Sequence, residues 1–227
     1  MLEVHNGYKN ARRFFTYDNA ANYDSIVYLT TFGQDSVWKN QIVKIIGKRH
    51  LVLDLACGTG ILSSMLTDKA AATKVIGFDL QFSYLQIAKN KRKNLLLTNG
   101  TAEILPYKNE YFDSVTSSYM AKYVNLKIVV DECWRILRHD GIVVFHDFTY
   151  PKNNLFQIFW NTYFMILRIT GYIVKSWFPV FNELDKLVKA SRWVEQTIES
   201  LKRRGFINIF CKYYTFGTTA IISARKP

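Results

Sequence analysis

The stretch Val52–Gly60 constrains the fold of this chain more than any other. It begins with apolar residues, as a buried parallel strand does, and then turns through Gly58 and Gly60 into a helical pattern. Because glycine has no Cβ, the backbone of such a turn can approach a ligand closely. The next apolar run ends at Asp79. A strand, a glycine-rich turn, a helix, a strand and an acid, in that order, predict the cofactor site of a doubly wound α/β fold.

The acidic residues indicate which cofactor to expect. Asp54 comes just before the turn, where the pyrophosphate of a dinucleotide would meet a negative charge, and Ser63 replaces the third glycine of the dinucleotide fingerprint. S-adenosylmethionine has no phosphate but carries an ammonium, a sulfonium and a ribose diol. We expect Asp54 to attract the ammonium and Asp79 to accept hydrogen bonds from the ribose. An NAD-like ligand, a vestigial loop and a turn that needs glycine for steric reasons alone are the alternatives, and the last leaves both acids unexplained.

Composition sets the broad class of the protein. Of the 227 residues, 49% are hydrophobic and 15% aromatic, which excludes a disordered chain and suits one α/β domain over residues 1–227. The net charge of +12 favours an anionic partner, although a solvated surface also explains it. The three cysteines, Cys57, Cys133 and Cys211, lie in apolar runs without metal-ligand spacing, so we expect buried thiols, no metal site and a cytoplasmic protein. The polar N-terminus predicts no signal peptide.

Apolar runs alternate with helical patterns along most of the chain, which predicts a Rossmann-like, mostly parallel sheet with helices on both faces. Helices are expected at 35–46 with Asp35 as N-cap, at 60–69 and 83–91, from Asn125 to a stop at 139–141, and between Ser191 and Gly205. Strands are expected at 52–55, 75–78, 95–97, 112–118, 142–145, 206–213 and 218–223. The last two strands would form an antiparallel pair and complete a seven-stranded sheet.

Two segments depart from this alternation. Residues 1–48 are expected to be helical and are rich in aromatic residues near their start, so they form either a lid over the cofactor or ordinary packing. Residues 151–190 form an apolar helical insertion, in which the stretch Leu155–Phe181 has Arg168 and Lys175 as its only charges. Its uncharged run is too short to span a bilayer. We favour an apolar substrate pocket or peripheral membrane contact over simple burial, because the positive charge of the chain also suits an anionic surface.

Polar residues follow the predicted strands at the edge where a parallel sheet binds its ligand. Ser118, Tyr119, Lys122 and Tyr123 lie at the end of the fourth strand, and His146 and Asp147 follow the fifth. The adjacent histidine and aspartate suggest either an acid–base pair or a polar pair that ends a strand.

Further motifs resemble those of one family. The stretches that carry the resemblance are Tyr23-Asp24, Thr31-Phe32-Gly33, Trp38-Lys39, the loop Val52–Gly60, Thr101-Ala102-Glu103-Ile104-Leu105-Pro106, Phe112-Asp113-Ser114-Val115-Thr116 and the tail from Gly205 to Lys226. With them the chain resembles a class I S-adenosylmethionine-dependent methyltransferase of the ubiquinone/menaquinone-biosynthesis C-methyltransferase family, over nearly its whole length. One departure stands out, since the Phe-Gly-Leu-Arg-Asn-Val stretch of the family is Tyr119-Met120-Ala121-Lys122-Tyr123-Val124 here.

The resemblance implies C-methylation of a prenylated quinol or a similar apolar small molecule by in-line transfer from S-adenosylmethionine. The cofactor-binding residues that we expect are Asp54, Ala56, Gly58, Thr59, Gly60, Asp79, Leu80, Thr101, Ala102 and Ser118. Lys122, Tyr123 and Tyr23 are the catalytic candidates, because a lysine stabilises a phenolate and a tyrosine relays a proton.

Other function classes compete with this one. Methylation of another lipid or small metabolite is close to it. Methylation of RNA or DNA is suggested by the charge, but the sequence has neither an Asp/Asn-Pro-Pro-aromatic motif nor a Pro-Cys pair, and we expect no nucleic-acid partner. A scaffold that binds the cofactor without turnover is the third alternative.

Overall fold

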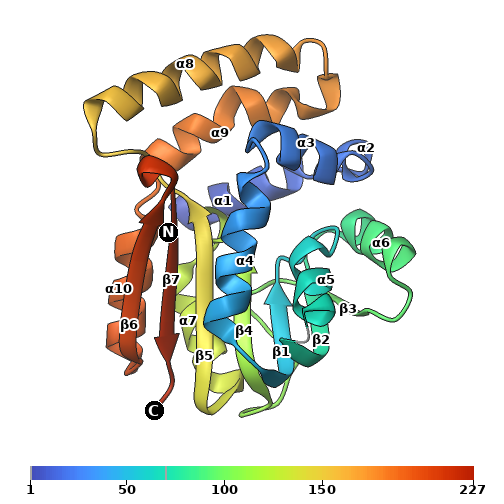
Figure 1. Cartoon of the computed structure of the whole chain (residues 1–227), viewed down its shortest axis with the longest axis vertical. Coiled ribbons are helices and arrows are strands. Elements are labelled where there is room, and N and C mark those ends of the chain that lie inside the picture. The colour runs from blue at the N-terminus through green and yellow to red at the C-terminus, as the bar shows by residue number, and fades with distance from the viewer. Residues whose placement is uncertain (1, 70) are drawn as a thin grey trace.

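A seven-stranded sheet forms the centre of the structure, a computed structural model that describes residues 2–69 and 71–227 (Figure 1). The strands are β1 (Arg49–Leu55), β2 (Ala72–Asp79), β3 (Leu96–Asn99), β4 (Phe112–Ser118), β5 (Leu137–Phe148), β6 (Ile207–Tyr214) and β7 (Thr219–Arg225), in the order β3-β2-β1-β4-β5-β7-β6. Strands β1 to β5 are parallel, whereas β7 runs antiparallel to both β5 and β6. The predicted fold class is therefore confirmed, including the antiparallel C-terminal pair.

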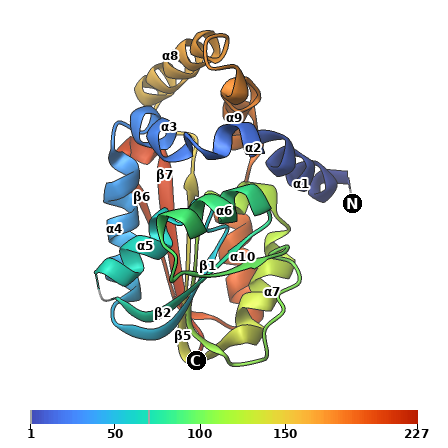
Figure 2. The same cartoon turned by 90° about the vertical axis from the view of Figure 1, so that its right-hand side faces the viewer.

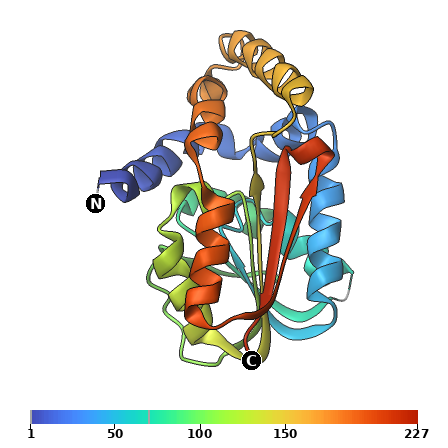
Figure 3. The same cartoon turned by 90° about the vertical axis from the view of Figure 1, so that its left-hand side faces the viewer.

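Helices cover both faces of this sheet (Figures 2 and 3). Helices α4 (Gln34–Ile46) and α5 (Ile61–Asp68) lie on one face, and α7 (Leu126–Ile136) and α10 (Trp193–Arg204) lie on the other, while α6 (Phe82–Lys91) follows β2. Successive residues of a strand point to opposite faces. Accordingly, Val52 packs with α4 and α5, and Leu53 packs with α7 and α10. The central strands β1, β4 and β7 are therefore mostly buried on both faces, as their apolar runs indicate, whereas the edge strands β3 and β6 are more exposed.

Several local predictions need correction. Helix α4 is capped by Gly33, whose φ of 72° is left-handed, and Asp35 is buried in the first turn instead of capping it. The predicted stop at 139–141 lies within β5, which already begins at Leu137. An irregularity in its pairing with β4 accommodates these residues, and Asp140 has a φ of 61°. Cys57 and Cys133 are buried as expected, but Cys211 is partly exposed. At the other end of α10, Gly205 caps the helix as predicted, with a φ of 97°.

The two segments that interrupt the alternation lie together beyond the carboxyl ends of the parallel strands (Figure 1). The first contains α1 (Leu2–Phe14), α2 (Tyr17–Ala20) and α3 (Tyr23–Thr30), and the second contains α8 (Asn154–Gly171) and α9 (Phe178–Ala190). They share an apolar cluster that includes Phe14, Trp160, Phe164, Trp177 and Phe181. The two segments therefore form one helical layer over the ligand edge of the sheet.

Candidate active site

A pocket of about 750 Å³, open to solvent, lies at the carboxyl ends of β1, β2 and β4. We call it the loop pocket, because the turn after β1 forms part of it. It brings together seven predicted cofactor-binding residues: Ala56, Gly58, Asp79, Leu80, Thr101, Ala102 and Ser118. Among its described lining residues, Asp79 and Glu103 are the only charged ones. A pocket whose only described charged lining residues are acidic suits a cationic ligand better than a pyrophosphate.

Asp79 is the anchor of the loop pocket. One carboxylate oxygen accepts from the backbone N–H of Gly58 at 2.8 Å, and the other accepts from the N–H of Gln81 at 2.7 Å. Each oxygen has a further lone pair with which to accept from a ligand hydroxyl. Gly58 has a φ of 55°, and an added Cβ would point at the ring of Tyr84, 3.7 Å away, so glycine keeps this part of the pocket clear. The donor set therefore fits the ribose diol of S-adenosylmethionine.

The other three predicted residues lie behind the turn and do not line the loop pocket. Asp54 is buried and accepts a 2.6 Å hydrogen bond from the Ser63 hydroxyl. Thr59 is buried too, and its hydroxyl donates to Asp24 of α3 at 2.5 Å. Gly60 caps α5 in a left-handed conformation. These residues shape the turn, and the bond to Asp24 ties it to the N-terminal helices.

Several residues that line the loop pocket are not among the predicted ones. Tyr8, Ala11 and Phe15 come from the N-terminal helices, and Gln81 and Tyr84 come from the start of α6. The aromatic-rich N-terminus was the available signal for the first group. No local sequence pattern marks Gln81, just before α6, or Tyr84, in its first turn, as ligand-binding residues.

A second, largely apolar pocket of about 710 Å³ lies next to the loop pocket. We call it the aromatic pocket. It is enclosed by α3, α8 and α9, with Trp160, Phe164, Trp177 and Phe181 among its lining residues, and Lys122 is the only charged one among those described. Four residues line both pockets: Phe15, Tyr23, Tyr119 and Tyr123. These four residues, which we call the shared aromatic wall, border both pockets, so ligands bound in the two pockets would both contact them.

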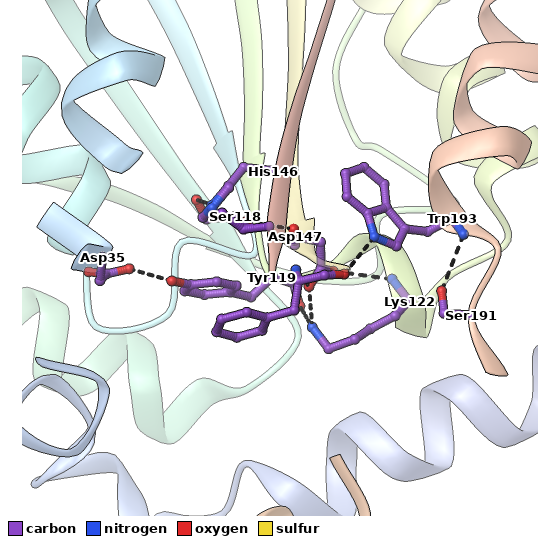
Figure 4. A network of polar contacts seen from close by, with 10 residues as sticks. Asp35, Ser118, Tyr119, Lys122, His146, Asp147, Ser191 and Trp193 are labelled. Carbon is purple, nitrogen blue, oxygen red and sulfur yellow. Dashed lines mark hydrogen bonds and ion pairs between the residues drawn. The ribbon is translucent and has the colours of Figure 1, made fainter. Parts of the chain in front are cut away.

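The three catalytic candidates all border the aromatic pocket. The ammonium of Lys122 is buried and donates to Asp147 at 2.5 Å and to the backbone oxygen of Tyr119 at 3.1 Å, which leaves one of its three N–H groups (Figure 4). The hydroxyl of Tyr123 is buried without a hydrogen-bond partner among the described residues. Tyr23 lies in the shared wall, and burial is the main cause that raises the pKa of its hydroxyl well above the ordinary value.

The hypothesis of an acid–base pair between His146 and Asp147 is wrong. Because neighbouring strand residues point to opposite faces, His146 lies 3.0 Å from the hydroxyl of Ser118, and Asp147 pairs with Lys122 instead (Figure 4). Burial, with help from the ammonium groups of Lys39 and Lys122, lowers the pKa of His146 well below its ordinary value. The imidazole is therefore neutral and supports Ser118.

Two carboxyl groups near the turn are buried without a cationic partner. Burial raises the pKa of Asp54 to about 7 and that of Asp79 to about 6, although hydrogen bonds oppose both shifts. Burial disfavours the charged form of each acid, so a bound cation would recover free energy that the unliganded protein loses.

Comparisons with known proteins agree with this geometry. The family model described as the ubiE/COQ5 methyltransferase family matches residues 9–226. A demethylmenaquinone methyltransferase of Thermus thermophilus is 27% identical over 92% of this chain and 98% of its own, and one of Streptomyces avermitilis is 29% identical over 90% and 89%. The fold is similar to that of a SAM-dependent methyltransferase from Archaeoglobus fulgidus, with a TM-score of 0.64 at 13% identity, covering 90% of this chain and 100% of that one.

Asp54→Asn is expected to stabilise the protein at about pH 8. The pKa of this carboxyl rises from 3.8 in the unfolded chain to about 7 in the folded protein. The free energy of unfolding therefore falls as the pH rises from about 4 to about 7, because the folded protein holds the proton more tightly than the unfolded chain does. The amide avoids this loss, and the gain at about pH 8 is up to about 4 kcal/mol. Chemical denaturation at about pH 4 and pH 8 measures it, and the gain should be small at the lower pH.

Asp113→Asn is the matched control, because the pKa of Asp113 is lowered by hydrogen bonds from Leu51 and Arg138 that outweigh its burial. That variant should lose stability at about pH 8. An Asp54→Asn protein that is no more stable than the wild type at about pH 8 would contradict the argument.

Proposed function

Because the chain belongs to the ubiE/COQ5 methyltransferase family, we propose that this S-adenosylmethionine-dependent methyltransferase methylates a ring carbon of a prenylated quinol or a similar apolar molecule. The observation that carries the proposal is the pair of adjoining pockets, one acidic at a glycine-rich turn and one apolar and aromatic. Methyl transfer needs the nucleophile, the methyl carbon and the sulfur in line. Two ligands that meet at one shared wall are placed for such an alignment.

In the loop pocket, S-adenosylmethionine supplies an electrophilic methyl group on a sulfonium. Asp79 would accept from the ribose hydroxyls, while Ala56 and Gly58 would offer backbone at the turn and Thr101 and Ala102 would border the adenine. Leu80 and Ser118 would complete the contacts. Asp54, Thr59 and Gly60 would act by shaping the turn, and the negative charge of Asp54 would attract the ammonium.

In the aromatic pocket, the chain offers apolar surface and few polar groups. The remaining N–H of Lys122 and the unpartnered hydroxyl of Tyr123 would bind the acceptor oxygen. An ammonium near that oxygen stabilises the negative charge that develops when the ring attacks the methyl group. Tyr23 would hold the ring against the donor. A quinol combines a hydroxylated ring with a hydrocarbon tail, which matches this lining.

The relatives support the same class of acceptor, since those from Thermus thermophilus and Streptomyces avermitilis are demethylmenaquinone methyltransferases. Another lipid or small metabolite is the alternative. Methyl transfer from labelled S-adenosylmethionine to a short-chain demethylmenaquinol, run beside a membrane lipid extract, tests both. Labelling of the quinol supports the proposal, and labelling of a different lipid alone contradicts the quinol.

We also propose that the helical layer contacts a membrane surface. No helix in the described part of the chain is both long and apolar enough to cross a bilayer. Helix α8 nevertheless exposes an outer stripe of large apolar side chains, Leu155, Ile158, Phe159, Met165, Ile166 and Ile169. Lys152 and Lys175 flank this helix, and the sequence has no acidic residue between Asp147 and Glu183. An apolar stripe with basic flanks suits an anionic interface, and residues 1–48 would form a lid on the same side.

Asp79→Ala should weaken S-adenosylmethionine binding by at least about tenfold, because it removes two charge-assisted hydrogen bonds of about 1.5–3 kcal/mol each. For the wild type, affinity should also fall as pH drops through about 6, since the protonated carboxyl loses its charge and part of its accepting capacity. Calorimetric titration measures both effects, with the exposed Asp68→Ala as control. Unchanged affinity in a folded Asp79→Ala protein would remove Asp79 from the cofactor site.

Tyr123→Phe should lower turnover by about 10²-fold or more while the protein becomes no less stable. The hydroxyl is buried and unpartnered in the unliganded protein, so its loss removes an unsatisfied group, whereas the acceptor loses a hydrogen-bonding partner. Lys122→Met should also lower turnover, with cofactor affinity within a few-fold of wild type. Steady-state methyl transfer and thermal denaturation report the two properties. Wild-type turnover in Tyr123→Phe would show that this hydroxyl does not act on the acceptor.

Membrane contact predicts co-flotation with vesicles of phosphatidylcholine and phosphatidylserine. High salt should weaken the association without abolishing it, because screening leaves apolar burial intact. Ile158→Glu with Ile169→Glu should abolish flotation, and the matched pair Ile128→Glu with Ile207→Glu, on α7 and β6, should not. Absence of flotation by the wild type at low salt would contradict membrane contact.

A further inference from the structure

A buried chain of polar groups begins at the shared aromatic wall. The hydroxyl of Tyr119 donates a 2.7 Å hydrogen bond to a carboxylate oxygen of Asp35 (Figure 4). The same oxygen forms an ion pair with Lys39. Asp35 and Lys39 are 3% and 4% exposed. Neither lines the loop pocket or the aromatic pocket, whereas Tyr119 lines both, so Tyr119 is the member of this network that a ligand in those two pockets can contact. The carboxylate of Asp35 is therefore linked to the pockets through its hydrogen bond with Tyr119.

The backbone of Tyr119 is held in an unusual conformation. This residue follows β4 directly and has a φ of 66°, a left-handed value that is uncommon for a bulky residue. Its ring stacks on Phe148 at 4.8 Å with an interplanar angle of 15°, and its N–H donates to the backbone oxygen of His146. Strained residues persist where the surroundings over-determine them, and such residues cluster at functional sites. The strain here turns the side chain into the wall between the two pockets.

Charged groups surround the ring of Tyr119. The ammonium of Lys39 lies 4.8 Å from the centroid of this ring, and that of Lys122 lies 5.7 Å from it. Asp147 is paired with Lys122, and the neutral ring of His146 lies 5.0 Å from the ring of Tyr119. Burial and the neighbouring carboxylate of Asp35 raise the pKa of Tyr119 well above its ordinary value. The phenol therefore stays protonated, and its O–H donates a hydrogen bond to Asp35. Its oxygen lone pairs are left to accept from a hydroxyl in the pocket.

We propose that Tyr119 is a catalytic residue, which takes the hydroxyl proton of the methyl acceptor while its own proton passes to Asp35. This role rests on the proposed function, because it needs an acceptor with a hydroxylated ring at the shared wall. Asp35 is then a positioning residue that acts through Tyr119, and Lys39 holds the carboxylate in place.

The acceptor O–H bond breaks and a Tyr119 O–H bond forms, while the former Tyr119 proton moves to Asp35. The electron pair left on the acceptor oxygen is delocalised through the ring to the carbon that forms the new bond to the methyl group. The bond between the methyl group and sulfur breaks, and its electron pair stays on sulfur. The methylated carbon then loses its proton to water as the oxygen takes a proton back through Tyr119. One proton is released overall, and Tyr119 and Asp35 return to their starting states.

Tyr119→Phe is the decisive variant, since it removes the hydroxyl and keeps the stacked ring. We expect kcat with the short-chain demethylmenaquinol to fall by about 10²-fold or more, with KM and S-adenosylmethionine affinity within a few-fold of wild type. Tyr111→Phe, a ring outside both pockets, is the matched control and should keep wild-type kcat. An equal kcat in wild type and Tyr119→Phe would overturn the proposal.

Asp35 needs a different design, because Asp35→Asn alone leaves the Lys39 ammonium buried without a partner. The double variant Asp35→Asn with Lys39→Met removes both charges together. It should show about the same loss of kcat as Tyr119→Phe, and adding Tyr119→Phe to it should cost little more, as expected for groups that act as one unit. Independent, multiplying losses would overturn the coupling of Tyr119 to Asp35.

A readout without turnover separates this proposal from the identity of the acceptor. Bound para-nitrophenol reports its ionisation by absorbance, and the wild type should hold a larger fraction as phenolate than Tyr119→Phe does at the same pH. If the wild type methylates no quinol yet this difference is present, the quinol is wrong and the role of Tyr119 is supported. If quinol is methylated and neither kcat nor the phenolate fraction depends on Tyr119, the proposed function stands and the role of Tyr119 is overturned.

Discussion

The parallel pairing of β1 with β4 is the constraint on which the rest of the site depends. The chain winds outward from β1 to β2 and β3 and then returns to pair β4 on the other side of β1. The connections after β1 and β4 therefore diverge, and a crevice opens at their carboxyl ends. The residues that leave these strands, Ala56 and Tyr119, both have positive φ values. Each turns sharply at the crevice, so the cofactor loop and the shared wall follow from the strand order.

Buried carboxylates divide the crevice into two electrostatic environments. Asp35 and Asp147 each form an ion pair with a buried lysine, and this pairing compensates their charges within the protein. Asp54 and Asp79 have no such partner, and burial raises the pKa of both. The unpaired acids lie at the glycine-rich turn, where a cationic donor would supply the missing charge. The paired acids lie toward the aromatic pocket, where a neutral acceptor brings no charge of its own.

Sequence patterns were sufficient to predict the strands of the sheet and the glycine-rich turn, because each of these is formed by contiguous residues. The apolar runs fix the strands, and Gly58 has a left-handed φ of 55°, which glycine adopts without strain. Contacts between distant segments were not predictable in this way. Asp35 at a helix start looks like an N-cap, and only the fold reveals Tyr119 beside it. His146 and Asp147 are neighbours in sequence, yet the pleat of the strand sends them to different partners.

The shared aromatic wall unites the requirements of donor and acceptor. Phe15 and Tyr23 of this wall meet each other and Tyr84 of the loop pocket edge to face, with ring centroids 5.2–6.2 Å apart. Tyr123 packs against Phe15 in the same way. Aromatic faces attract cations, so a sulfonium is stabilised beside this wall without a formal negative charge that would neutralise its reactivity. The same rings give a flat apolar surface to a second ring. A pocket with carboxylates at this point would bind the donor more strongly but repel the negative charge that develops on the acceptor. Aromatic rings avoid that conflict, since Asp79 lines the loop pocket alone and Asp35 lines neither of the two pockets.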